Sequence, residues 1–118
     1  MRTNLVTRFF QWIRAQWIKR FEFLLPTKYN DGTAIEPEKL NLTTRELSQR
    51  FGGVSQDLVH VHGLWQHGNE AYRDVLIRLR VDSADVKATA FLKAYKEQLK
   101  ARFKQLDIWI TAQQIEII

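Results

Sequence analysis

The sequence contains no cysteine, which excludes disulfide frameworks, thiolate zinc sites, iron–sulfur ligation and cysteine nucleophiles. It also lacks a glycine-rich phosphate loop, a nucleophile elbow and an HExxH motif. No apolar run approaches the length of a membrane span, and the first residues lack the apolar segment of a secretory signal. These absences give no reason to expect a cofactor or an oxidising compartment, so we predict a cytoplasmic protein without a cofactor.

Acidic side chains are missing from the first 20 residues, which contain five basic ones. Residues 21–118 contain 13 basic and 13 acidic side chains, so the net charge of +5 belongs to the N-terminal segment. A nucleic-acid-binding domain usually gathers Lys and Arg over its binding surface. The neutral remainder of the chain therefore argues against nucleic acid as a partner.

The basic N-terminal segment has the pattern of an amphipathic helix. At about 100° per residue, its apolar side chains fall within one broad arc. They are Leu5, Val6, Phe9, Phe10, Trp12, Ile13 and Trp17. We predict a helix over residues 1–20 and a single domain over residues 21–118. Three roles stay open for this helix: packing on its own domain or a second copy, lying on an anionic membrane, or binding a partner protein.

After residue 20 the chain alternates between strand and helix patterns. We expect strands over 21–25, 58–65 and 70–81, helices from Glu36 or Pro37 to Phe51 and over 84–103, and β-rich segments over 106–111 and 115–118. The resulting order, β-α-β-β-α-β, is that of the split βαβ plan. The sequence therefore predicts an α+β, ferredoxin-like fold, with a four-stranded antiparallel sheet that carries two helices on one face.

The two-residue period of the strands assigns side chains to the two faces of this sheet. The apolar face should lie under the helices, and it consists of Phe21, Phe23, Val59, Val61, Val75, Ile77, Leu79, Ile108 and Ile110. The open face consists of Glu22, Leu24, His60, His62, Asp74, Leu76, Arg78, Arg80, Trp109 and Thr111. Leucines and a tryptophan among charges suggest that the open face meets the N-terminal helix, meets a second copy, or encloses a ligand.

Several short motifs resemble the motif order of small bacterial proteins of unknown function. They are Leu25-Pro26, Tyr29-Asn30-Asp31-Gly32, Arg50-Phe51-Gly52-Gly53-Val54, Gly63-Leu64-Trp65, Arg102-Phe103-Lys104-Gln105 and Ile108-Trp109-Ile110. The resemblance covers most of residues 25–118 and leaves the N-terminal segment outside. It implies no activity, so no functional residue is transferred from it.

The three histidines are the candidate metal ligands. His60 and His62 lie two apart on a predicted strand, so their side chains should leave the same face, and His67 in the turn would be a third ligand. The spacing alone is a weak signal, because imidazole has many uses that need no metal. We therefore favour the simpler interpretation, in which half-exposed histidines of the sheet face bond a carboxylate or a dimer partner.

A second candidate site combines acid–base and ligand-binding groups on the open face. His60 and His62 beside Asp74 would provide general acid–base chemistry. Arg78 and Arg80 would hold an anionic ligand, and Trp109 would contact its apolar part. A charge pair that faces solvent or a dimer partner is the simpler interpretation, and the fold alone would give only an analogy.

These patterns leave two functions open. The first is a small self-associating domain, a homodimer, with a binding or structural role and with its contact on the sheet face or the N-terminal helix. The second is an enzyme or a protein that binds a small ligand or a metal on the open sheet face. Whether the protein is an enzyme stays undecided at this point.

Overall fold

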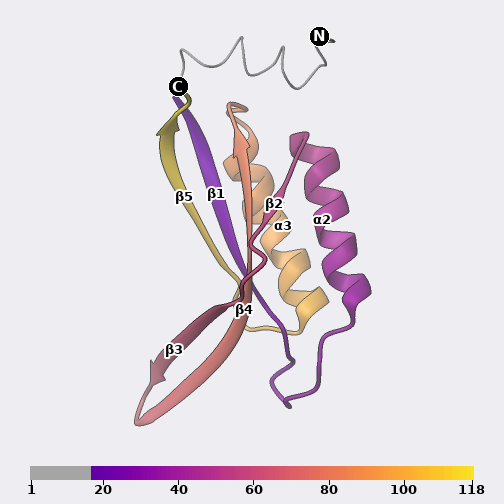
Figure 1. Cartoon of the computed structure of the whole chain (residues 1–118), viewed down its shortest axis with the longest axis vertical. Coiled ribbons are helices and arrows are strands. Elements are labelled where there is room, and N and C mark those ends of the chain that lie inside the picture. Colours follow the sequence, from indigo (N-terminus) through magenta and orange to yellow (C-terminus); the bar gives the residue numbers. More distant parts are fainter. Residues whose placement is uncertain (1–16) are drawn as a thin grey trace.

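The computed structural model describes residues 17–118, and all statements about the structure concern these residues. In chain order, the elements are β1 (Trp17–Pro26), α2 (Pro37–Phe51), β2 (Ser55–Gln56), β3 (Val61–His67), β4 (Glu70–Ser83), α3 (Ala88–Phe103) and β5 (Trp109–Glu116). Figure 1 shows both helices on one side of the sheet. The predicted α+β class and the predicted helical cover are therefore confirmed.

The sheet is antiparallel, with the order β2-β4-β1-β5, and β3 pairs with β4 on the same side as β2. If β2 and β3 are taken as two parts of one edge strand, this order is that of a ferredoxin-like sheet. The prediction of four strands was wrong in one respect, because the described residues form five. The expected strand over 58–65 begins only at Val61, and the edge is divided, because a short strand ahead of it, β2 (Ser55–Gln56), pairs with β4 separately.

The division of this edge has a simple geometric cause. Gln56 lies opposite Leu79, whereas Val61 lies opposite Leu76. Between these two pairs, the edge segment advances by five residues and β4 by only three. The two extra residues bend the edge segment out of the ladder, as in a β-bulge. Beyond this bend, β3 pairs with residues 70–76 of β4, of which only Leu76 also pairs with β1. This break decides which way the histidines face.

The hairpin of β3 and residues 70–76 of β4 extends beyond the rest of the sheet, and we call it the arm. Figure 1 shows the arm projecting away from the two helices. Its turn contains Gly68 with a positive φ of 62°, a conformation that glycine adopts without a steric penalty. The predicted hairpin is thus confirmed, with β3 beginning three residues later than expected and β4 continuing to Ser83.

The core lies between the helices and the apolar sheet face. Phe21, Phe23 and Leu25 of β1 and Leu79 and Val81 of β4 are buried there. From the helices, the core receives Leu47 of α2 and the stripe Ala88, Leu92, Tyr95, Leu99 and Phe103 of α3. Leu40 and Phe51 of α2 pack against this core but are only partly buried.

The predicted ends of the elements needed several corrections. β1 begins at Trp17, inside the segment predicted as a helix, and residues 1–16 of that predicted helix lie outside the described residues. α3 begins at Ala88 and not at 84, because Ser83 and Asp85 form a turn before it. Ser83 Oγ accepts a hydrogen bond from the Asp85 backbone N–H at 3.0 Å, and Asp85 Oδ1 accepts one from the Lys87 N–H at 2.8 Å. The two C-terminal segments form one strand, β5.

Candidate functional site

The open sheet face opposite the helices carries most of the side chains that the two-residue period placed there. Residues directly opposite each other in a ladder share a face. Glu22 lies between Arg80 and Thr111, and Leu24 lies between Arg78 and Trp109. Leu76 lies opposite Pro26 on the same face. The three predicted ligand-binding residues, Arg78, Arg80 and Trp109, therefore do lie on one surface.

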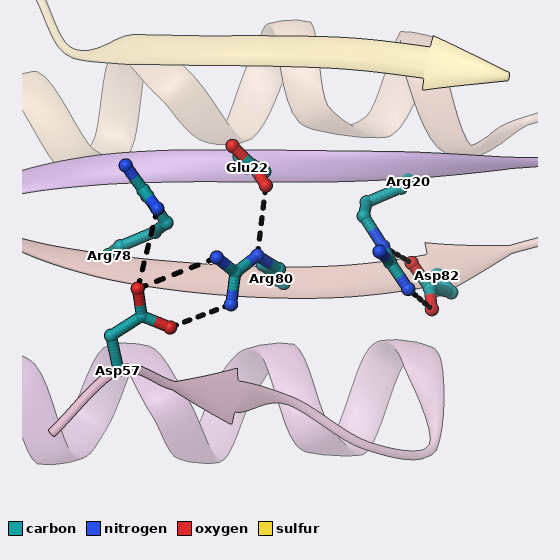
Figure 2. Close-up of polar contacts among 6 residues, drawn as sticks. All are labelled: Arg20, Glu22, Asp57, Arg78, Arg80 and Asp82. Carbon is teal, nitrogen blue, oxygen red and sulfur yellow. Dashed lines mark hydrogen bonds and ion pairs between the residues drawn. The ribbon is translucent and has the colours of Figure 1, made fainter. Parts of the chain in front are cut away.

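Ion pairs join the strands across this face, as Figure 2 shows. Arg80 donates from Nε to Glu22 Oε1 at 2.9 Å and from Nη1 to Asp57 Oδ1 at 2.6 Å. Arg78 Nη1 reaches Asp57 Oδ2 at 3.4 Å. The hydrogen bonds of Arg80 raise its pKa, and the bond to Glu22 contributes more than the bond to Asp57. Asp57 was not among the predicted site residues, and it neutralises much of the charge that an anionic ligand would meet.

A second pair completes the row of charges. Arg20 bonds Asp82 through two nitrogens, at 2.9 and 3.1 Å, and this hydrogen bonding raises the pKa of Arg20. With Arg78, Arg80, Glu22 and Asp57, the row contains three guanidinium and three carboxylate groups. Because the net charge of the row is zero, the row does not form a basic patch. Its ion pairs instead connect β1, β4 and the segment that contains β2. An anion-binding role for Arg78 and Arg80 stays a prediction.

The structure does not bring the three predicted catalytic residues together. His62 lies opposite Val75, whereas Asp74 lies opposite Gly63, so these two side chains leave opposite faces of the arm. His60 precedes β3 in the bent segment. The placement of His62 on the open face was therefore wrong, since the face of β3 follows from its register after the bend. Val61 takes the place that was expected for the histidines.

His67 lies at the far end of the arm, opposite Glu70. Residues 17–118 contain no group of three or more His, Asp or Glu side chains placed to hold a metal ion. The candidate metal ligands His60, His62 and His67 are thus separated in this part of the chain. A site for a divalent cation is not supported by the geometry.

A groove of about 760 Å³ lies between the arm, the loop after β1 and the start of β5. Two indoles face each other in it, because Trp65 of the arm and Trp109 of β5 have ring centroids 6.3 Å apart and are tilted by 36°. Apolar side chains of Leu24 and Leu76 line the groove between these strands. Trp109 was predicted as a ligand-binding residue, but Trp65 was not.

Gly63 explains how Trp65 reaches this position. The two residues lie on the same face of β3, and a Cβ built at Gly63 would lie 2.8 Å from three atoms of the Trp65 indole. Any other residue at this position would therefore push the ring away. The signal in the sequence was the motif Gly63-Leu64-Trp65, in which a glycine stands two residues before a large aromatic side chain.

The polar groups of the groove come from two sides. Tyr72 and Asp74 lie on the Trp65 side of the arm, and the Tyr72 hydroxyl donates to Glu70 Oε2 at 2.5 Å, which raises the pKa of Tyr72. The opposite wall is the loop 27–32, which contains Tyr29. The hydroxyl of Tyr29 is bonded to Glu36 and to Lys39.

Asp31 stabilises the turn after β1. Its Oδ1 accepts hydrogen bonds from the Thr33 backbone N–H at 2.9 Å and from the Thr33 hydroxyl at 2.6 Å. These bonds to Thr33, with the hydroxyl first, lower the pKa of Asp31. The carboxylate therefore closes the loop 27–33, which is sufficient to explain an aspartate there.

The fold and the groove define a small ferredoxin-like α+β domain with an extended hairpin. Solved structures with this fold confirm the class, although no protein-family model and no curated protein matches the chain. A phage SAM lyase in complex with S-methyl-5'-thioadenosine superposes with a TM-score of 0.60 at 16% identity, covering 86% of this chain and 82% of the lyase.

Two divalent cation tolerance proteins superpose equally well. CutA1 from Thermus thermophilus gives a TM-score of 0.60 at 17% identity over 83% of this chain and 84% of its own. CutA from Xylella fastidiosa gives 0.61 at 14% identity over 86% of both chains. At these identities the similarity shows the fold alone. Within residues 17–118, neither helix has the length and apolar character needed to cross a membrane.

Proposed function

We propose that the protein is a self-associating binding domain whose subunits join along the outer edge of β3. The observation that carries this proposal is the set of exposed apolar side chains on that edge. Leu58, Val59 and Leu64 are 98%, 79% and 57% exposed. All three belong to the bent segment or to β3, and none of them lines the groove.

The backbone of β3 supports the same proposal. Among residues 17–118, β3 pairs only with β4, so the backbone groups on its other side are free to pair with another strand. Natural edge strands usually avoid such pairing with proline, lysine or an inward-pointing charge. The sequence of β3, Val-His-Gly-Leu-Trp-Gln-His, contains neither proline nor lysine. The edge is therefore suited to the addition of a strand.

A second copy of this chain is the partner that fits best. A two-stranded hairpin is only marginally stable alone in water, and the end of the arm extends beyond the helices that cover the central sheet. Its charges, Glu70, Arg73 and Asp74, nearly cancel, which disfavours an anionic membrane or nucleic acid as the partner. Pairing of β3 with β3 of the second copy gives a homodimer, and pairing of β3 with β5 gives a ring.

The experiment is a mass measurement by light scattering over a range of protein concentrations. We expect an oligomer for the natural chain and a monomer for Leu64→Lys, because a lysine at the edge opposes strand addition. Val86→Lys is the matched control, since Val86 is 95% exposed in the turn before α3, away from the arm. A natural chain that is monomeric at every concentration contradicts the proposal. A mass of two chains indicates β3–β3 pairing, and a larger closed mass indicates β3–β5 pairing.

A second candidate function is the binding of a small molecule in the groove. Ligand sites are typically concave, of roughly 300–1,000 Å³, and mostly apolar with a few polar groups. The groove has about this volume and contains Trp65 and Trp109. S-methyl-5'-thioadenosine, the molecule in the phage SAM lyase complex, has a flat purine ring of the kind that indoles stack against.

Tryptophan fluorescence during titration with S-methyl-5'-thioadenosine tests this second function. We expect a saturable change for the natural chain and its loss in Trp109→Leu, because Trp109 forms one aromatic wall of the groove. Trp12→Leu, in the N-terminal segment, serves as a control for the loss of one fluorophore. An equal saturable change in natural chain and Trp109→Leu would show that the binding is elsewhere.

A further inference from the structure

We propose that the groove takes an organic cation, with Asp74 supplying the opposite charge and Trp65, Tyr72 and Trp109 supplying aromatic faces. This inference rests on the ligand-binding function proposed for the groove and names its ligand class. Asp74 is exposed and lines the groove. Within residues 17–118 it makes no salt bridge, unlike Asp57, Asp82 and Asp107.

The ladder places Asp74 among aromatic rings. Asp74 lies opposite Gly63, and the Trp65 indole lies over that glycine because no Cβ stands in its way. Tyr72 is two residues from Asp74 on the same face and lies opposite Trp65. Trp109 approaches Trp65 from β5. The carboxylate thus lies beside three aromatic side chains that a ligand can reach. Trp65 is 41% exposed, Tyr72 is 47% exposed and Trp109 is 57% exposed.

This combination selects for a cation with an apolar surface. A cation over the face of a tryptophan or tyrosine is attracted by the ring quadrupole, and this attraction is stronger when water is excluded. A nearby carboxylate adds a Coulomb attraction of similar size. A neutral ligand gains neither contribution. An anionic ligand would be repelled by Asp74, and the arginines of the open face are already bonded to carboxylates.

The remaining charges of the groove are compatible with this assignment. Arg73 also lines the groove, but it alternates with Asp74 along β4, so its side chain leaves the ladder on the other face of the arm, opposite Leu64. Lys28 belongs to the loop on the opposite wall, and Asp107 is paired with Lys96 at 2.8 Å. Asp74 is therefore the unpaired carboxylate of the groove within the described residues. An inorganic divalent cation would need several oxygen ligands, which this part of the chain does not bring together.

The experiment compares three probes by tryptophan fluorescence and by the indole N–H signals of the NMR spectrum. Choline is the organic cation, 3,3-dimethylbutanol is its neutral isostere, and adenosine is a neutral flat ring. We expect choline to bind roughly tenfold more tightly than the isostere, the ratio that corresponds to about 1.4 kcal/mol. Asp74→Asn should remove this preference by weakening the binding of choline. Glu38→Gln, an exposed acid on α2, is the matched control and should behave as the natural chain.

The outcomes separate this inference from the function on which it rests. If adenosine shifts the Trp65 and Trp109 signals but choline binds no better than its isostere, the groove binds ligands and the cation class is wrong. The cation class is also wrong if Asp74→Asn keeps the preference for choline. If no probe shifts either indole, both the cation class and the ligand-binding function of the groove are contradicted.

Discussion

Tyr95, Arg102, Glu46 and Thr43 form a polar group between the two helices, inside an otherwise apolar layer. Arg102 donates to Glu46 Oε1 at 2.7 Å and to Thr43 Oγ1 at 2.8 Å, and Tyr95 donates to Glu46 Oε1 at 2.9 Å. Only 13% of the Arg102 side chain is exposed. Each of these groups therefore depends on the others to replace the hydrogen bonds that water would supply.

The titration of Tyr95 makes this group measurable. Burial is the first cause that raises the pKa of Tyr95, to about 12, and Arg102 opposes it. Since the folded state holds the phenol proton more tightly than the unfolded state, the resulting stability is complete below pH 10 or so, the ordinary tyrosine pKa. It is lost as the pH rises from there to about 12. The alkaline sensitivity of the fold should therefore depend on this residue.

Tyr95→Phe should lower the free energy of unfolding at pH 8 by about 1 kcal/mol, because the hydrogen bond to Glu46 is lost. Between pH 9 and pH 11.5 or so, the natural chain should lose roughly 2 kcal/mol more than the variant. Urea unfolding at several pH values measures both effects. Tyr72→Phe is the control and should change the pH dependence much less, since Tyr72 lies on the exposed arm. Equal alkaline losses for the natural chain and Tyr95→Phe would contradict the assignment.

At the scale of elements, the arm is held in shape by contacts within its own ladder and by the Trp65–Trp109 pair. The helical layer does not reach its end. Gly63 is the residue that allows the Trp65 indole to lie along β3 and meet Trp109. The arrangement of the two indoles should therefore change when a single methyl group is added at Gly63.

Gly63→Ala should separate the two indoles, because the new Cβ would lie 2.8 Å from the Trp65 ring and the exposed ring is free to rotate. The expected change in the free energy of unfolding is small, within about 1 kcal/mol, since the ring is at the surface. The circular dichroism signal of the coupled tryptophans should decrease. Gly53→Ala is the matched control, because a Cβ there has no neighbour within 4 Å. An unchanged tryptophan signal in Gly63→Ala would show that the ring pair does not depend on this glycine.

At the scale of the whole molecule, β1 begins at Trp17, four residues before the predicted start of the domain at Phe21. Residues 17–20 pair with β5, Lys19 and Arg20 also pair with β4, and Arg20 bonds Asp82. Removal of residues 1–20 would therefore damage the central strand of the sheet. Residues 1–16 can be removed without cutting any described strand, which allows the predicted roles of this segment to be tested.

A chain that begins at Trp17 should keep the mass of the natural oligomer, because the proposed contact on β3 is retained. A chain that begins at Phe21 should be less stable, since it lacks four residues of β1. Light scattering and urea unfolding of both chains measure these effects. A monomer for the chain that begins at Trp17 would identify residues 1–16 as the assembly element. Co-sedimentation with anionic vesicles, which should be lost with residues 1–16, tests the predicted membrane role.

The sequence by itself determined the class and order of the elements. The stripe of Leu92, Tyr95 and Leu99 and the alternation of Ile77, Leu79 and Val81 are local patterns, and each needs only a buried side to become a helix or a strand. The same alternation placed Arg78 and Arg80 with Glu22 on the open face, because β1 and β4 pair without interruption. Local periodicity is sufficient to assign side chains to a face of the sheet wherever the pairing of two strands continues without a break.

Only the tertiary structure decided the face of the histidines and the composition of the groove. The side chain of His62 points away from Asp74 because the bend before β3 sets the register of that strand. The number of residues in such a bend cannot be read from the periodicity of the sequence. Trp65 and Trp109 meet although 43 residues lie between them in the sequence. Such a contact depends on the twist of the arm toward β5, which is a property of the assembled sheet and of no single segment.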